Sequence, residues 1–319
     1  MALSIKKVKQ KIKSLQYTSY LAPRHWPLWF AIGVLRLSVL LPTTVIQHIG
    51  SALGLLIYRL MPSRRRTARI NIKQAYPDYT KNEIDTLNKA AFKSLGISIF
   101  EMGEAWFEKS SALKKRCQIE GKEHLDLAIA KNRPVILLTG HFTTLEIGSR
   151  LIGFYCKKYN GVYKKSHDPL FNAIMVRHRS TFGDALIENK DVRNIIRGLK
   201  NGHATWFAPD QDFKRQDIVF TPFLGGIAST LTATAKLARI TGASVIPFYP
   251  VRLSNGKGFK LIVLPALDNF PSQDIEADST RVNKTIEEMV YKHPEQYLWS
   301  HQRFKTQPGG RSSLYAASE

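Results

Sequence analysis

The sequence predicts an α/β fold in which a mixed, largely parallel sheet is sandwiched by helices, preceded by a membrane-inserted or interfacial N-terminal helix. Two observations predict the sheet and its helices. From Pro134 onward short apolar runs alternate with amphipathic segments, and residues 81–106 repeat apolar side chains every three or four positions. The third observation is an apolar stretch over residues 25–41, which predicts the N-terminal helix.

The N-terminal stretch reads HWPLWFAIGVLRLSVLL and carries Trp26 and Trp29 near its start. A transmembrane helix needs about 20 apolar residues, and Arg36 interrupts this run. Interfacial tryptophans and flanking basic residues are typical of a helix anchored at the membrane surface, with a buried core helix as the alternative. The lysine-rich residues 6–13 predict that the chain begins on the cytoplasmic side.

The charge balance is strongly basic, with 47 Lys and Arg against 25 Asp and Glu and a net charge of +22. Nucleic acid, an anionic membrane face or an acidic substrate-carrying protein would each suit that charge. We expect a basic, membrane-associated helical region (1–61), an α/β domain (62–308) and a polar tail (309–319). Cys117 and Cys156 show neither metal nor redox spacing, so we expect reduced thiols.

The alternating pattern assigns a state to each segment after Pro134. We expect strands at 135–140, 160–164, 184–188, 204–210, 244–250 and 259–265, and helices at 144–155, 170–180, 192–200 and 231–240. Ligands of open α/β sheets bind at the carboxyl ends of the strands. Polar residues that follow these runs are therefore the first candidates for a site.

The strongest candidates are His141 and Glu146, which follow the first apolar run. On one regular helix, five steps would separate their side chains by about 140°, too far for contact. If His141 lies on the turn and Thr143 or Thr144 caps the next helix, Glu146 can fold back to the imidazole. The carboxylate would then fix one ring nitrogen and leave the other free to take a proton.

Several ordered blocks carry a family resemblance. GHFTTLEIG resembles the HX4D/E signature of the glycerolipid and lipid A acyltransferases, and the companion blocks are GVYKKSHDP, WFAPDQDF, ASVIPFYP and QYLWSHQRFKTQP. Their order and approximate spacing resemble the late acyltransferases of lipid A biosynthesis, particularly the lauroyl type, as do RHWPLWFAIGVLRLSVLLP and EMGEAWF. The resemblance covers roughly residues 23–308.

The resemblance implies an enzyme of the cell inner membrane whose active site faces the cytoplasm. Such enzymes move an acyl chain from acyl carrier protein to a hydroxyl on the 3-hydroxyacyl chains of a Kdo-bearing lipid A precursor, without a cofactor. The implied partners are acidic acyl carrier protein, the anionic lipid A precursor and inner-membrane phospholipids, and no nucleic acid is expected. His141 would be the general base and Glu146 its orienting partner, with the hydroxyl attacking the thioester directly.

The resemblance also assigns substrate-binding residues. Lys164 stands where related enzymes usually carry arginine, so we expect Lys164 and Lys165 to act as point charges rather than as a bidentate guanidinium. We expect Asp210 and Asp212 to hold a basic side chain or an acceptor hydroxyl, with simple loop carboxylates as the alternative. No third ligand pattern accompanies them, so no metal site is expected. Arg303 is expected to bind phosphate, because a planar guanidinium suits phosphate bidentately.

Two other functions fit parts of the sequence. Acylation of a glycerolipid such as lysophosphatidate uses the related HX4D signature, but usually with aspartate at the carboxylate position. A non-catalytic basic protein that binds membranes or nucleic acid would share the net charge, but would not need a His-Glu pair at a strand end. The length of the acyl chain and the tetra- or penta-acylated state of the acceptor stay open, because a single sequence does not define the depth of an apolar tunnel.

Overall fold

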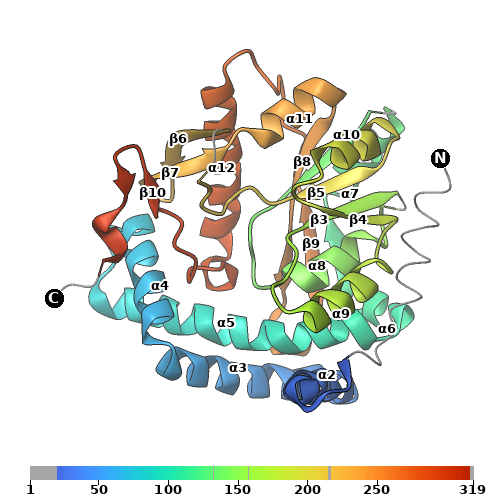
Figure 1. Cartoon of the computed structure of the whole chain (residues 1–319), viewed down its shortest axis with the longest axis vertical. Coiled ribbons are helices and arrows are strands. Elements are labelled where there is room, and N and C mark those ends of the chain that lie inside the picture. Colours follow the sequence, from blue (N-terminus) through green and yellow to red (C-terminus); the bar gives the residue numbers. More distant parts are fainter. Residues whose placement is uncertain (1–19, 132, 157, 215–216, 317–319) are drawn as a thin grey trace.

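The computed structural model describes residues 20–131, 133–156, 158–214 and 217–316, and the lysine-rich start lies outside them. The described chain begins with helices that form a layer beside the sheet domain (Figure 1). Their bounds are η2 (Pro23–His25), α2 (Trp26–Ser38), α3 (Thr43–Leu60), α4 (Pro62–Ala75), α5 (Lys81–Phe107) and α6 (Ser110–Lys115). Pro42 separates α2 from α3, so the two apolar runs form two helices instead of one long one.

None of the described helices is by itself long and apolar enough to cross a membrane. α3 and α4 satisfy length and composition only as a pair, and that pair is bent by 98°. The break falls beside Pro62, at the first position of α4, where proline is tolerated because the N–H it lacks would be unpaired anyway. The membrane role of the N-terminal helices therefore stays a prediction.

α5 is the long helix against which the N-terminal layer packs. It begins with a capping box, in which the Thr80 hydroxyl accepts from the Glu83 N–H and the Glu83 carboxylate accepts from the Thr80 N–H. α3 approaches it through Gly50, Gly54 and Gly96: a Cβ placed on Gly96 would lie 2.1 Å from the Gly50 carbonyl oxygen and 2.3 Å from the Gly54 nitrogen. The two helices therefore touch along their backbones.

The main sheet has seven strands in the order β1-β9-β8-β2-β5-β3-β4. Their bounds are β1 (Cys117–Glu120), β2 (Val135–Leu138), β3 (Tyr159–Tyr163), β4 (Ala185–Glu188), β5 (Ala204–Phe207), β8 (Ser244–Arg252) and β9 (Phe259–Val263). The pairs from β8 through β4 are parallel, whereas β8 and β9 are antiparallel. The predicted mixed, largely parallel sheet is confirmed.

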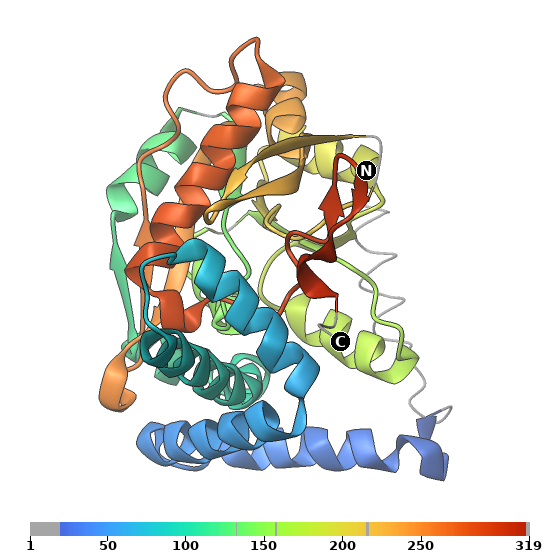
Figure 2. The same ribbon diagram turned by 90° about the vertical axis from the view of Figure 1, so that its left-hand side faces the viewer.

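Helices cover both faces of this sheet (Figures 1 and 2). The remaining helices are α7 (Lys122–Ala130), α8 (Leu145–Ile152), α9 (Pro169–Arg179), α10 (Val192–Lys200), α11 (Ala233–Thr241) and α12 (Ile275–Lys292), with short 3-10 turns η3 (Ser254–Gly256), η4 (Pro294–Gln296) and η5 (Ser313–Tyr315). Two hairpins, β6–β7 (Ile218–Phe223 and Gly226–Leu231) and β10–β11 (Thr306–Gln307 and Gly310–Arg311), lie outside the main sheet.

The two core layers follow from the alternation along β2. Ile136 and Leu138 pack with side chains of α10, α11 and α12, whereas Val135 and Leu137 pack with side chains of α7 and α8. A strand that is apolar on both faces is the pattern of a parallel strand buried between helix layers. This burial holds the carboxyl end of β2 rigidly, and the first candidate residues follow it.

Candidate active site

The strand order brings His141 and Asp210 to the same edge of the sheet. His141 follows β2 and Asp210 follows β5, and these strands are parallel neighbours, with Leu138 opposite Phe207. Gly140 allows the close approach, because a Cβ there would lie 2.9 Å from Ile286 Cγ2 and 3.3 Å from Asp210 Oδ2. Two residues far apart in the sequence thus meet at one turn.

Asp210 binds His141 at two points. Its Oδ1 lies 2.6 Å from His141 Nδ1, and its Oδ2 accepts from the His141 backbone N–H at 2.8 Å. The Tyr297 hydroxyl donates to the same Oδ2 at 2.9 Å. Asp210 is completely buried, whereas 26% of the His141 side chain is exposed. Asp210 therefore holds a basic side chain, one of the two functions expected of it.

These contacts define the protonation of the pair. Burial would raise the pKa of Asp210, but the His141 charge and the hydrogen bonds from His141 and Tyr297 lower it to about 2. Asp210 is thus an ionised carboxylate, which can only accept hydrogen bonds, so His141 Nδ1 carries the proton. His141 Nε2 has no hydrogen-bond partner among the described residues and is left to take a proton.

Glu146 does not make the contact predicted for it. Its carboxylate accepts from Arg179 Nε at 2.9 Å and from Trp106 Nε1 at 2.7 Å, and it forms an ion pair with Arg179. α8 begins at Leu145, so Glu146 lies on the face of that helix that packs against α5 and α9. A partly buried arginine binds a carboxylate more strongly than a neutral imidazole does, because the hydrogen bonds are charge-assisted. The prediction of a His141–Glu146 contact was wrong in its geometry.

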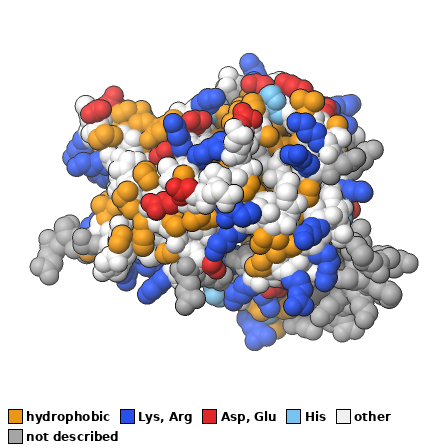
Figure 3. Space-filling model, turned by 90° about the horizontal axis from the view of Figure 1, so that it is seen from above, with side chains coloured by type: hydrophobic (Ala, Val, Ile, Leu, Met, Phe, Trp, Pro, Cys, Tyr) orange, Lys and Arg blue, Asp and Glu red, His pale blue; other side chains and the backbone are white. Residues whose placement is uncertain are grey.

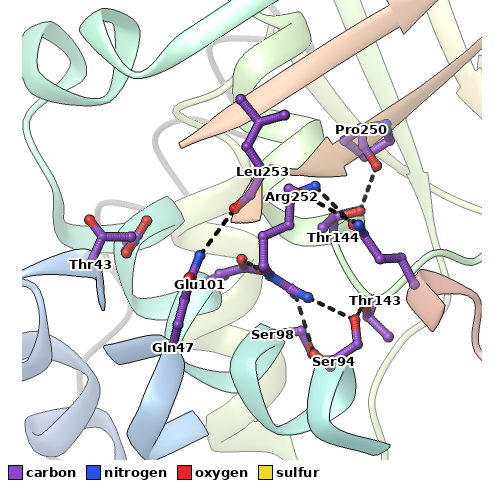
Figure 4. A network of polar contacts seen from close by, with 12 residues as sticks. Thr43, Gln47, Ser94, Ser98, Glu101, Thr143, Thr144, Pro250, Arg252 and Leu253 are labelled. Carbon is purple, nitrogen blue, oxygen red and sulfur yellow. Dashed lines mark hydrogen bonds and ion pairs between the residues drawn. The ribbon is translucent and has the colours of Figure 1, made fainter. Parts of the chain in front are cut away.

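The capping prediction was right in position but wrong in the side-chain contact. Thr144 occupies the N-cap of α8, but its side chain makes no cap hydrogen bond and instead donates to the Pro250 carbonyl at 2.8 Å. The Thr143 hydroxyl lies 2.7 Å from the Ser94 hydroxyl of α5. Both threonines therefore attach the His141 turn to neighbouring elements (Figure 4).

A buried arginine extends these attachments. Arg252, at the end of β8, forms an ion pair with Glu101 of α5 and donates to the Ser94 hydroxyl at 2.7 Å, as Figure 4 shows. Ser94 in turn contacts Thr143. Arg252 also binds Gln296, whose carbonyl accepts from the Thr143 N–H at 2.8 Å. Arg252 is one of the polar residues that follow the predicted strands, and its contact with Glu101 was not predicted.

Helix α8 is fixed at its second turn as well. Arg150 donates to the carbonyls of Glu104 and Ala105, near the end of α5, and to that of Glu108, the residue that follows it. A guanidinium at that position adds donors to carbonyls at the end of the helix and lies at the negative end of the helix dipole. Glu146 and Arg150 are one turn apart, so together they attach α8 to α5.

Of the other predicted site residues, Lys164 and Lys165 lie on the surface near His141, whereas Asp212 contacts neighbouring loops. Lys164 and Lys165 are exposed after β3, the strand that pairs with β5, so they lie at the same sheet edge as His141. Asp212 accepts from the Thr306 N–H at 3.0 Å, and its own N–H donates to His301 Nε2 at 2.9 Å. Asp212 thus stabilises loops rather than facing solvent.

Arg303 is not where a phosphate-binding residue would be. It is only 3% exposed, donates to the Ser229 carbonyl and to Thr230 Oγ1, and lies over the Phe223 ring. Burial lowers the pKa of its guanidinium. The prediction that Arg303 binds phosphate was therefore wrong, because the side chain points inward and supports the β6–β7 hairpin.

The two cysteines and the possible metal ligands can also be examined in the structure. Cys117 and Cys156 are free thiols. Among the residues that the structure describes, no group of three or more His, Cys, Asp and Glu side chains could hold a metal ion.

Comparisons with known proteins agree over almost the whole chain. The family model described as bacterial lipid A biosynthesis acyltransferase matches residues 15–306. Lipid A biosynthesis lauroyltransferase of Escherichia coli K12 is 36% identical over 299 residues, covering 93% of this chain and 97% of that protein. Lipid A biosynthesis palmitoleoyltransferase of the same organism is also 36% identical, covering 93% and 96%. A lipid A biosynthesis acyltransferase of Haemophilus influenzae is 33% identical, again covering 93% and 96%.

Proposed function

The chain belongs to the bacterial lipid A biosynthesis acyltransferases, and from that premise we propose that it transfers a fatty acyl chain from acyl carrier protein to a hydroxyl of a lipid A precursor. The acceptor would be a hydroxyl on the 3-hydroxyacyl chains of a Kdo-bearing precursor. The observation that carries the proposal is the partly exposed His141 ring, held through Nδ1 by a buried carboxylate.

The proposed reaction needs only groups that the chain provides. His141 Nε2 takes the proton from the acceptor hydroxyl as its oxygen attacks the thioester carbonyl carbon. The new C–O bond forms, the C–S bond breaks, and the departing thiolate receives the proton from the imidazolium. Asp210 keeps the ring in the required tautomer and stabilises its transient positive charge. No acyl-enzyme is required, and Glu146 acts by positioning α8 rather than by touching the ring.

The charge of the molecule supports an acidic donor and an anionic acceptor. The net charge is +22, and Lys164 and Lys165 are exposed at the edge of the sheet that carries His141. We assign these two lysines to substrate binding, where an ammonium acts as a point charge rather than as a bidentate group. Basic side chains are also spread among apolar and acidic ones over the face seen in Figure 3.

The N-terminal helices support association with a membrane surface. α2 exposes Trp26, Phe30, Val34 and Leu37, which recur every three or four residues and so share one side of the helix. α3 likewise exposes Val45, Ile49, Leu56 and Leu60. Figure 2 shows both helices along one side of the molecule. A large exposed apolar surface on a basic protein suits an anionic bilayer, here the cytoplasmic side of the inner membrane.

The length of the acyl chain is not decided by identity, because the lauroyl and palmitoleoyl enzymes are equally similar to this chain. We propose a lauroyl-like donor and test it with a panel of acyl carrier protein thioesters. Product mass spectrometry should show transfer to the lipid A precursor, with a preferred chain length. Transfer only to lysophosphatidate would overturn the proposed acceptor, and transfer from acyl-coenzyme A alone would overturn the donor.

His141→Ala separates catalysis from binding. We expect acyl transfer to fall by about 10²–10⁴-fold, the usual contribution of a general base. Membrane association should be unchanged, because His141 lies at the sheet edge rather than on α2 or α3. Undiminished transfer would refute the assignment of the base.

A further inference from the structure

We propose that a pocket lined by three arginines, at the bend between α3 and α4, binds a phosphate monoester on a lipid headgroup. The pocket has a volume of about 290 Å³. Arg65, Arg66 and Arg69 of α4 line it together with Asp85 and Asn88 of α5. We call it the arginine pocket, and it is separate from the His141 turn.

The arginine pocket carries an excess of positive charge. Arg69 lies 3.4 Å from Asp85, so one of the three guanidinium groups has a carboxylate partner. Among the described residues, Arg65 and Arg66 have none: Arg65 contacts the Tyr58 carbonyl and ring, and Arg66 donates to the Ala316 carbonyl. Three cations against one anion leave a charge of +2 inside a concave, partly buried surface.

A second observation points to a ligand. Asn88 lines the pocket and is completely buried, and its Oδ1 has no hydrogen-bond partner among the described residues. Its Nδ2 already donates to the Arg65 carbonyl at 3.1 Å, which fixes the orientation of the amide. A buried acceptor without a donor is costly, so the wall of the pocket at Asn88 has an unmet hydrogen-bonding requirement in the free protein.

The position of the pocket favours a lipid over a soluble anion. Leu60 and Met61, at the bend that forms one wall, are exposed and continue the apolar side of α3. A headgroup could therefore enter the pocket while its acyl chains stay against that apolar side. α4 also reaches toward the active site, because Ala68 lines a small cavity together with Thr143. Arg65 and Ala68 are about one helical turn apart.

The charge of the ligand follows from the charge of the pocket. A phosphate monoester carries about −1.5 to −2 at neutral pH, which matches +2, whereas a diester carries only one negative charge. Guanidinium groups bind phosphate oxygens through paired N–H donors. Two lipids could supply this monoester, a phosphorylated acceptor and a bilayer phospholipid. The first source rests on the proposed function, and the second does not.

The test measures binding of the full chain to vesicles without an acyl donor. Neutral phosphatidylcholine vesicles are doped with phosphatidic acid, a monoester, or with phosphatidylglycerol, a diester, at matched surface charge. We expect tighter binding to the monoester vesicles, and competition by inorganic phosphate. Arg65→Ala should weaken monoester binding by about 10- to 100-fold, the range expected for a lost charge-assisted hydrogen bond.

Arg59→Ala is the matched control, because Arg59 is exposed on α3 next to Tyr58 but does not line the pocket. It should weaken binding by about fivefold or less, the contribution of one near-surface basic residue. Arg65→Lys should give an intermediate loss, since it keeps the charge and removes the planar fork. Equal losses for Arg59→Ala and Arg65→Ala, with unchanged thermal melting, would overturn the pocket in favour of general surface attraction.

Lipid A precursor, intact or stripped of its phosphates, distinguishes the two sources when placed in neutral vesicles. If the native chain prefers the intact precursor and Arg65→Ala does not, the ligand of the pocket is the acceptor. If the native chain prefers only phosphatidic acid, the ligand is a bilayer lipid. Binding of inorganic phosphate without any lipid preference would overturn the proposal. His141→Ala should bind all these vesicles as the native chain does, so failure of the pocket and failure of the acyl-transfer chemistry are separate outcomes.

Discussion

Asp210→Asn changes one atom of the side chain that holds His141, and its effect can be worked out from the contacts. Oδ2 accepts from two donors, the His141 N–H and the Tyr297 hydroxyl, so the amide oxygen of asparagine should take that position. The amide NH2 would then face His141 Nδ1, which must become an acceptor, and the ring proton moves to Nε2. The base is lost although the fold is retained.

The expected loss is most of the general-base contribution, about 10²–10⁴-fold in kcat, or about 3 to 5 kcal/mol of barrier. The assay is the initial rate of acyl transfer from acyl carrier protein thioester to the lipid A precursor, with kcat and KM measured separately. KM should change little, because Asp210 is buried behind the ring.

Glu146→Gln is the matched control, since it makes the same chemical change in the other carboxylate. Glu146 contacts Arg179 and Trp106, so we expect lower thermal stability and a loss of kcat below about tenfold. The opposite result, with Asp210→Asn within threefold of native and Glu146→Gln nearly inactive, would refute the His141–Asp210 pairing and restore the one predicted from the sequence.

Three further predictions concern stability and membrane binding. Arg252→Met leaves Glu101 buried without its cation, so urea titration should show that the free energy of unfolding falls by about 3 to 5 kcal/mol. Adding Glu101→Met should recover most of that loss. A double variant whose loss equals the sum of the two single losses would contradict this. Burial raises the pKa of Glu104 to about 7 although a neighbouring arginine opposes it, so its stabilising neutral form is lost as pH rises from about 4.5 through 7. The free energy of unfolding of Glu104→Gln should therefore exceed that of the native chain by an amount that grows between pH 5 and pH 8, up to about 3 kcal/mol. A difference that stays constant over this pH range would argue against the prediction. Phe30→Glu places a charge on the exposed side of α2 and should reduce binding to anionic vesicles by about tenfold; unchanged binding would show that α2 does not meet the membrane.

Much of the fold was predictable because local pattern and tertiary packing agree. The helix expected at 192–200 has the bounds of α10, where Asp191 caps the first turn and Ile195 and Leu199 face the core. α12 was missed although Val282, Ile286 and Met289 recur at threes and fours, so the signal was present in the sequence. The N-terminal run was extended three residues too far, to 41, since the break before Pro42 carries no change in hydropathy.

The active site was less predictable, because its decisive contact is not local. His141 and Asp210 are 69 positions apart, and they meet only because β2 and β5 are neighbours in the sheet. Sequence spacing favours Glu146 as the partner of His141. It does not reveal that Arg179, 33 positions after Glu146, binds the Glu146 carboxylate instead. Strand order and competing ion pairs are properties of the folded chain, so neither can be read from a motif.

The glycine contact between α3 and α5 has a consequence for how the enzyme meets its substrate. Helices that touch along their backbones at Gly50 and Gly96 pack closely, so α3 and α5 can separate only by breaking that contact. α5 is in turn joined to the His141 turn through Ser94 and Thr143. With the apolar sides of α2 and α3 in the lipid, as proposed, these contacts set the height of His141 above the bilayer. An acceptor hydroxyl at another depth would then have to rise or sink to reach it.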